Sequence, residues 1–351
     1  MPGCARREIV RDEVPVIYHC WSRCVRRAFL LGTDPLTGKD YNHRRGWLIE
    51  RLELLAANFL IDVGFLAILA NHFHLVLRTN PRLVKRMGSW EVARRWLRVY
   101  PGKRVLDGNW IEPTEEQVRA LARDKKKIKV IRRRLASVSW FMAGLKEYLA
   151  RRANAEDGCR GAYFESRFAC RAIESDGGLL VAGIYNDLNQ IRAGEALTPE
   201  TSIWCSVWFR IQAQKQEKKN SNLPIEDRMD RWLAPLTLEV GHLGDVPSAD
   251  GYRSSDKGLL PMSMNDYLRL LDFAGRQVRK GKRGAIPADL EPILTRLGIV
   301  PVQFLAAVQK FPQWFRRFSG SAADFVERAK EINRRSLHGV SHARRIFTES
   351  S

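Results

Sequence analysis

The sequence has few cysteines, and they form no recognisable pattern. The six cysteines in 351 residues include no C-x-x-C pair, which argues against a zinc ribbon or a disulfide scaffold. We therefore expect reduced thiols and a cytoplasmic protein. The first residues, MPGCARREIVRDE, are charged and contain no apolar run, so no secretory leader is expected. The longest apolar stretch, Phe59 to Ala70, is interrupted by Asp62 and is too short to span a bilayer.

The chain also lacks a Gly-rich phosphate loop, an internal repeat and a balance of charge. The missing loop predicts no nucleotide cofactor. The sequence contains 59 Lys and Arg residues but only 39 Asp and Glu residues, which gives a net charge of +20 at pH 7. Such an excess favours a polyanionic partner, of which nucleic acid is the commonest. A soluble protein from a cell with a basic proteome is the alternative interpretation of the charge.

Hydrophobic periodicity predicts an α+β fold. Three strands and one helix precede residue 80, and another strand and helix follow a helical segment. A Ser at 175 is a predicted N-cap for the last helix, and Gly194 ends it. The predicted strands are Val14–Ser22, Val63–Leu69, His72–Leu77 and Gly161–Ile173, and the predicted helices include His43–Ile61, Glu91–Tyr100 and Leu179–Arg192. This order is typical of a ferredoxin-like βαββαβ sheet.

Changes in composition divide the chain into three parts. We expect a domain over residues 1–200, with a basic helical insertion at about 103–152. The polar residues 201–223 are the predicted linker, and residues 224–351 form a basic, mainly helical C-terminal extension. If these boundaries are right, a fragment that ends near residue 210 should fold by itself.

The segment Asn71-His72-Phe73-His74-Leu75-Val76-Leu77 contains the first candidate site. Side chains alternate along a strand, so His72 and His74 should project from one face while Phe73 enters the core on the other. Two imidazoles side by side can bind one metal ion. The alternative is a pair of histidines that only pack in the core.

A second candidate site lies in the predicted helix Leu179–Arg192, in the run YNDLNQIRAG. Tyr185 and Asn189 are four residues apart and should share a helix face. A phenol one turn from an amide oxygen could serve as a metal-assisted nucleophile. The alternative is that Tyr185 packs its ring while Asn189 belongs to the end of the helix.

These segments together resemble the HUH transposases with a single catalytic tyrosine, and especially the REP-associated tyrosine transposases. NHFHLVL is similar to their PNHFHLL motif, and YNDLNQIRAG to YxxLNPxRAG. YFESRFACRAI is similar to FEGRFKS, and VIYHCWSRCVRR to YHVTSRG. The resemblance covers about residues 8–200 in the same order, and it implies an α+β HUH endonuclease fold.

The resemblance also implies roles for four residues. Tyr185 matches the nucleophile, His72 and His74 match the metal pair, and Asn189 matches the third ligand. A divalent ion, Mg²⁺ or Mn²⁺, is the implied cofactor. The family's two prolines are replaced by Ala70 and Gln190, next to functional positions. The insertion between His74 and Tyr185 is longer than in a compact member, which leaves the choice of DNA open.

We therefore expect a transposase that cuts and rejoins single-stranded or hairpin DNA through a 5′-phosphotyrosyl intermediate, in the cytoplasm and associated with the nucleoid. A monomer and a homodimer are both compatible with the sequence. A domesticated DNA-binding protein that has lost strand transfer is one alternative, and an HUH replication initiator or relaxase is another. The candidate DNA contacts are Lys125, Lys126, Lys127, Arg132, Arg133, Arg134, Arg167 and Arg192.

Overall fold

The computed structural model describes residues 8–101, 112–238, 247–280 and 291–348. In this part of the chain the strands are β1 (Ile17–Arg23), β2 (Ile61–Ile68), β3 (His72–Thr79), β4 (Ala169–Ile173) and β5 (Phe318–Ser319). The helices are α1 (His43–Asn58), α2 (Pro81–Arg86), α3 (Ser89–Val99), α4 (Glu115–Arg123), α5 (Lys125–Leu135), α6 (Val138–Glu156), α7 (Asp176–Asp187), α8 (Asn189–Arg192), α9 (Ser206–Lys219), α10 (Met264–Lys280), α11 (Glu291–Arg296), α12 (Phe304–Trp314), α13 (Ala322–Glu331) and α14 (Val340–Ile346).

The strands form one five-stranded sheet in the order β2-β3-β1-β4-β5. The first four strands pair antiparallel, whereas β5 runs parallel to β4. The fold is therefore mixed α and β, as predicted. The register places Trp21 of β1 opposite His74 and Arg23 opposite His72.

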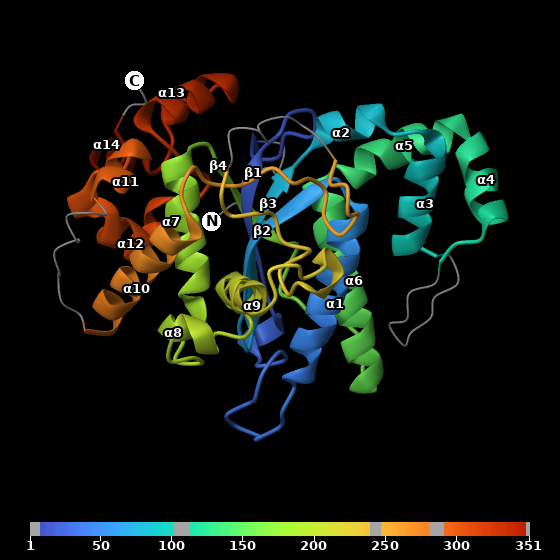
Figure 1. The fold of residues 1–351 in the computed structure, drawn as a ribbon, viewed down its shortest axis with the longest axis horizontal. Coiled ribbons are helices and arrows are strands. Elements are labelled where there is room, and N and C mark those ends of the chain that lie inside the picture. The colour runs from blue at the N-terminus through green and yellow to red at the C-terminus, as the bar shows by residue number, and fades with distance from the viewer. Residues whose placement is uncertain (1–7, 102–111, 239–246, 281–290, 349–351) are drawn as a thin grey trace.

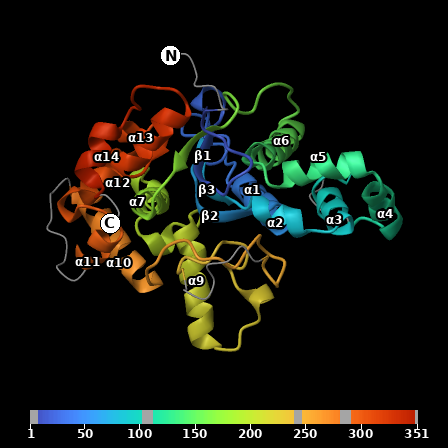
Figure 2. The same ribbon diagram turned by 90° about the horizontal axis from the view of Figure 1, so that it is seen from above.

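Helices cover both faces of the sheet. In Figures 1 and 2, α7 lies on one face with the C-terminal helices beyond it, α1 and α6 lie on the other face, and α3 to α5 extend further out on that side. Phe73, Leu75 and Leu77 are fully buried, as their alternation predicts. Gly183 allows α7 to approach the sheet closely, because a Cβ there would lie 2.6 Å from the Phe65 ring.

Several predicted elements differ from the observed ones. The predicted strand Gly161–Ile173 is shorter, because only Ala169–Ile173 pairs with β1. The predicted helix Leu179–Arg192 is two helices, α7 and α8, which meet at Leu188. Side chains on either side of the break bond to the chain that follows: Asp187 accepts from Val207 N at 3.0 Å, and Gln190 from Trp204 N at 3.1 Å.

The basic insertion predicted at about 103–152 contains α4, α5 and most of α6 in its described part, whereas residues 103–111 lie outside the described residues. Ser175 caps α7 as predicted, since its side chain accepts from Gly178 N. Gly194 ends this region in the left-handed conformation, with φ +76°. Within the described residues, no helix is long and apolar enough to cross a membrane, and the cysteines there form no disulfide.

The C-terminal part of the chain is joined to the sheet at both edges. At one edge β5 pairs with β4, and α12 packs on α7. At the other edge, residues 254–258 bond to β2 and β3. The division at residues 200 and 223 stays a prediction, but the described residues after 223 contribute to the same core as the first part.

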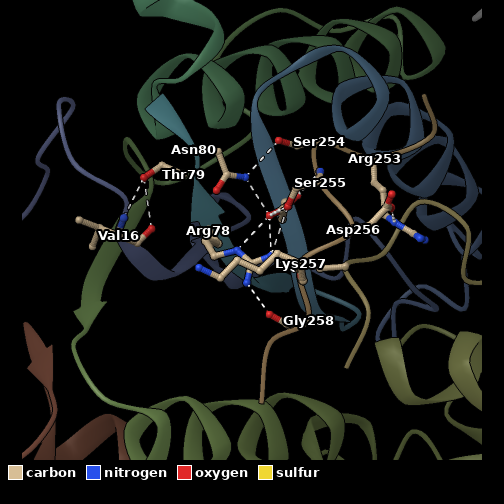
Figure 3. Close-up of polar contacts among 12 residues, drawn as sticks. Val16, Arg78, Thr79, Asn80, Arg253, Ser254, Ser255, Asp256, Lys257 and Gly258 are labelled. Atoms are coloured by element: carbon tan, nitrogen blue, oxygen red, sulfur yellow. Dashed lines mark hydrogen bonds and ion pairs between the residues drawn. The ribbon is translucent and has the colours of Figure 1, made fainter. Parts of the chain in front are cut away.

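A buried ion pair organises the β2 edge (Figure 3). Arg78 donates to Asp62 Oδ2 at 2.9 and 2.7 Å, and to the carbonyl of Gly258 at 2.7 Å. Asn80 donates to the same carboxylate at 2.8 Å, and so does the Ser255 hydroxyl at 2.8 Å. Asp62 interrupts the apolar stretch in the sequence because it holds the C-terminal segment on the sheet.

We expect Asp62→Ala to destabilise the protein by about 3–5 kcal/mol, because Arg78 would remain buried without its counter-charge. Urea unfolding followed by circular dichroism measures this change. Glu115→Ala is the control, since it removes only a surface ion pair with Arg119 and should cost at most about 1 kcal/mol. Equal losses in the two variants would contradict the structural role of Asp62.

Candidate functional site

His72 and His74 lie on the same face of β3, as their spacing predicts. Their ring centroids are 5.0 Å apart, and the ring planes are nearly perpendicular. His74 also stacks on His19 of β1, with centroids 5.1 Å apart. Three imidazoles therefore meet on the face of the sheet that α7 covers. The role of His19 was missed in the sequence, although the residue stands in the predicted first strand.

Hydrogen bonds determine which nitrogen of His72 can bind a ligand. Asn71 Nδ2 donates to the Arg27 carbonyl at 3.2 Å, which fixes the orientation of the Asn71 amide. Its Oδ1 then lies 2.6 Å from His72 Nδ1, so this nitrogen carries the proton. The lone pair of His72 Nε2 is left for a metal ion or another donor.

His74 makes a similar contact with His19. His74 Nδ1 and His19 Nε2 are 3.1 Å apart in the protein interior, whereas His19 Nδ1 is buried without a hydrogen-bond partner in the described part of the chain. When His74 donates in this pair, its Nε2 also keeps a lone pair. Burial lowers the pKa of His72 to about 4 and the pKa of His74 well below its usual value. Both rings are therefore neutral near pH 7, as metal ligation requires.

Tyr185 of α7 lies beside these histidines. Its ring centroid is 5.8 Å from that of His74 and 6.0 Å from that of His19. The ring is covered by Phe311 of α12, at 5.5 Å, and by the guanidinium of Arg192, at 5.1 Å. The residue is only 8% exposed, and its hydroxyl makes no hydrogen bond with another described residue. The structure thus brings Tyr185 and the histidine pair together.

The position of Asn189 is less directly tied to the pair. It begins α8, which packs against β2, and it is buried with its Nδ2 unpartnered. No hydrogen bond joins it to His72 or His74 among the described residues. Across that same part of the chain, no three His, Cys, Asp or Glu side chains gather so as to hold a metal ion. Two neutral imidazoles fit part of a metal site, and no contact among the described residues places Asn189 beside them.

Arg171 adds a positive charge that sequence reasoning missed. It pairs with His19 across β4 and β1 and is 3% exposed. Its Nη1 donates to the carbonyls of Phe311 and Phe315, whereas its Nε has no partner. Burial lowers the pKa of Arg171 to about 10, so it is charged near pH 7. No carboxylate pairs with it among the described residues.

The predicted DNA contacts fall into two groups. Arg132 donates to the Val84 carbonyl, Arg134 lies over Trp140 at 4.0 Å, Lys127 pairs with Asp124, and Arg192 covers Tyr185. The other group, which is exposed and makes no ion pair in the described part of the chain, comprises Lys125, Lys126, Arg133 and Arg167. Their contact with DNA stays a prediction.

The buried histidines predict acid sensitivity. In the folded state the pKa of each ring is lowered, whereas an unfolded histidine titrates near 6.5. The unfolded state therefore binds more protons between pH 6.5 and about 4, so stability falls as the pH drops through this range. His72 alone accounts for up to about 3 kcal/mol. Urea unfolding with a chelator at pH 7 and pH 5 measures the loss, which should be smaller in His72→Asn. Equal stability at both pH values in the unmodified protein would contradict this prediction.

No protein-family model matches the chain, and no curated protein matches its sequence. Among solved structures, the chain is similar to a REP-associated tyrosine transposase bound to a REP hairpin. The TM-score is 0.34 and the identity 10%, and the match covers 63% of this chain and 88% of the other. A TM-score of this size does not establish a common fold, so the function is inferred from the residues of the chain itself.

Proposed function

We propose that the chain is a single-tyrosine HUH transposase that cuts and rejoins single-stranded or hairpin DNA. The sheet supports the fold, because β2-β3-β1-β4 with antiparallel pairings is the order of a ferredoxin-like βαββαβ chain. The observation that carries the function is the contact between Tyr185 and the histidine pair on one face of this sheet.

In the proposed reaction, the Tyr185 oxygen attacks a phosphodiester phosphorus and displaces the 3′-oxygen. A phosphotyrosyl bond forms to the 5′-phosphate of the downstream strand, the P–O3′ bond breaks, and the phenolic proton is transferred to the released 3′-oxygen, so that the upstream strand ends in a free 3′-OH. A phenol has a pKa near 10 in water and is a weak nucleophile at pH 7. Arg171, buried and charged beside Tyr185, would stabilise negative charge on the phenol and the phosphate.

We propose that His72, His74 and Asn189 hold a divalent cation, Mg²⁺ or Mn²⁺. When bound, the cation would supply Lewis-acid polarisation of the phosphate. The neutral imidazoles with Nε2 lone pairs support this assignment for the two histidines, whereas for Asn189 the support is the sequence resemblance alone.

The proposal is tested with 3′-labelled single-stranded and hairpin DNA in the presence of Mn²⁺. The label should remain on the protein through denaturing electrophoresis, because the downstream strand carries the phosphotyrosyl bond. With 5′-labelled DNA, the protein should release a shortened fragment with a free 3′-OH. Failure to form the adduct on any substrate would count against the transposase.

Removal of the imidazoles should abolish cleavage but not binding. We expect His72→Ala to lower Mn²⁺-dependent cleavage by more than about 100-fold. Asn71→Ala, which removes the partner of His72 and a bond to the Arg27 carbonyl, should cost about 10–100-fold in metal affinity. Cleavage over a Mn²⁺ titration measures both. His43→Ala is the control, since His43 is exposed on α1 and pairs with Glu156. Unchanged cleavage by His72→Ala would remove it from the site.

A DNA-binding protein without strand transfer is the second candidate, and the burial of Tyr185 favours it. Phe311 and Arg192 leave the ring 8% exposed, whereas a nucleophile must reach a phosphate. In the transposase, the part of Tyr185 that stays accessible must therefore include its hydroxyl. If the second candidate is right, the protein should bind hairpin DNA as tightly as a transposase would, but it should never form the covalent adduct.

A further inference from the structure

A positively charged pocket opens in the C-terminal part of the chain, away from the residues discussed so far. Its volume is about 230 Å³, and it lies between the turn that joins α12 to β5 and the loop that joins α13 to α14. The lining residues are Arg316, Arg317, Phe318, Arg334, Ser336, Leu337 and His338. The pocket offers three guanidinium groups, a hydroxyl and an imidazole.

Among the residues that the structure describes, one carboxylate pairs with these arginines. Glu8 lies 3.0 Å from Arg334 and 3.5 Å from Arg317. Arg316 is exposed and makes no ion pair within the described residues. Three guanidinium groups against one carboxylate leave the pocket positively charged. Partial burial, followed by the charges of Arg316 and its neighbours, lowers the pKa of His338, as expected in a positive field.

The loop that forms one wall is held in a defined shape. Asn333 and Gly339, at its two ends, both have positive φ angles, of 53° and 106°. A side chain at Gly339 would collide with the Trp314 carbonyl, at 2.6 Å. The wall therefore lies directly against the end of α12.

The pocket is connected to the candidate site through α12. Phe311 of this helix contacts Tyr185, and Arg316 follows the end of the helix at Trp314. Three strand spacings separate β3 from β5, or roughly 14 Å, which is about four nucleotide steps at ~3.4 Å per step. The exposed residues of α5 lie on the opposite side of the sheet, beyond α6 (Figures 1 and 2).

We propose that this pocket binds a backbone phosphate of the same DNA strand that Tyr185 attacks, a few nucleotides from the cut. The inference rests on the proposed function for the identity of the strand. Guanidinium groups suit the pocket to a phosphate, because their planar forks donate two hydrogen bonds to its oxygens. The C-terminal part of the chain would then hold the substrate as well as complete the sheet.

The test compares Arg316→Gln with Lys218→Gln, which removes an equally exposed charge at the far end of α9. Fluorescence anisotropy with single-stranded and hairpin DNA should show about tenfold weaker binding for Arg316→Gln, and a slope of log K against log[salt] smaller by about 1. Lys218→Gln should bind as the unmodified protein does. The proposal would be overturned if both Arg316→Gln and the double variant Arg316→Gln/Arg334→Gln bound DNA as tightly as the unmodified protein does.

Neutral methylphosphonate linkages locate the phosphate. One neutral linkage is placed at each position of the strand in turn. At one position, within a few nucleotides of the cut, it should weaken binding of the unmodified protein. Arg316→Gln should be insensitive at that same position, and equal sensitivity in both proteins would overturn the assignment. If the adduct forms but Arg316→Gln leaves DNA binding unchanged, only the proposed phosphate site in the pocket is refuted. If Arg316→Gln weakens DNA binding but no adduct forms, only the proposed transposase activity is refuted.

Discussion

Tyr185→Phe should bind hairpin DNA normally and form no covalent adduct. The substitution removes one hydroxyl that makes no hydrogen bond with another described residue, so the ring contacts with His74 and Phe311 remain. Removal of a nucleophile can lower a rate by about 10⁶-fold, which places adduct formation below detection at any Mn²⁺ concentration. Electrophoresis with 3′-labelled DNA measures the adduct, and anisotropy measures binding.

Tyr163→Phe is the matched control. Tyr163 is also buried, but its hydroxyl donates to the Leu30 carbonyl at 2.7 Å, and burial raises its pKa above the ordinary range. An oxygen held in this way is a poor nucleophile, so Tyr163→Phe should still form the adduct. Capture of labelled DNA by Tyr185→Phe would identify another nucleophile, and loss of the adduct in Tyr163→Phe alone would reverse the two assignments.

The local parts of the site could be predicted from the sequence. Alternation along β3 places His72 and His74 on one face, and this depends only on strand geometry. The chain order of strands and helices likewise indicated a mixed α and β sheet. These features depend on neighbouring residues, and short-range periodicity is sufficient to find them.

Features that depend on distant residues could not be predicted in this way. The stacking of His19 on His74 requires the register between β1 and β3, and Arg171 reaches the site only through the pairing of β4 with β1. The break between α7 and α8 depends on bonds from Asp187 and Gln190 to the following segment. No local pattern in the sequence contains these pairings.

The place of the C-terminal part in the fold also could not be predicted from local sequence patterns. Its composition and the polar linker before it indicated an appendage. The strand β5 is two residues long, too short to give a periodic signal, yet it continues the sheet. Phe311, Phe315 and Phe318 are almost completely buried, which an appendage on a finished domain would not require.

We therefore expect a fragment that ends at residue 223 to lack a stable fold, contrary to the expectation from sequence for a fragment ending near 210. Truncation removes β5 and α12, exposes the face of α7 that holds Tyr185, and separates buried Asp187 from the hydroxyl of Tyr267. It also removes Ser255, whose backbone N–H and hydroxyl both donate to Asp62 at the other edge of the sheet. A domain is typically stable by only about 5–15 kcal/mol, so the loss of these contacts at both edges of the sheet should leave the fragment without a stable fold.

Urea unfolding and the dispersion of amide signals in NMR spectra measure the outcome. The full chain should unfold cooperatively, whereas the 1–223 fragment should show no cooperative transition. Residues 224–351, expressed as a second chain, should restore the transition on mixing, because the missing surfaces complement those left on the fragment. A cooperative transition in the fragment alone would show that residues 1–223 fold independently. In that case Phe311 would shield Tyr185 without being needed to form the fold around it.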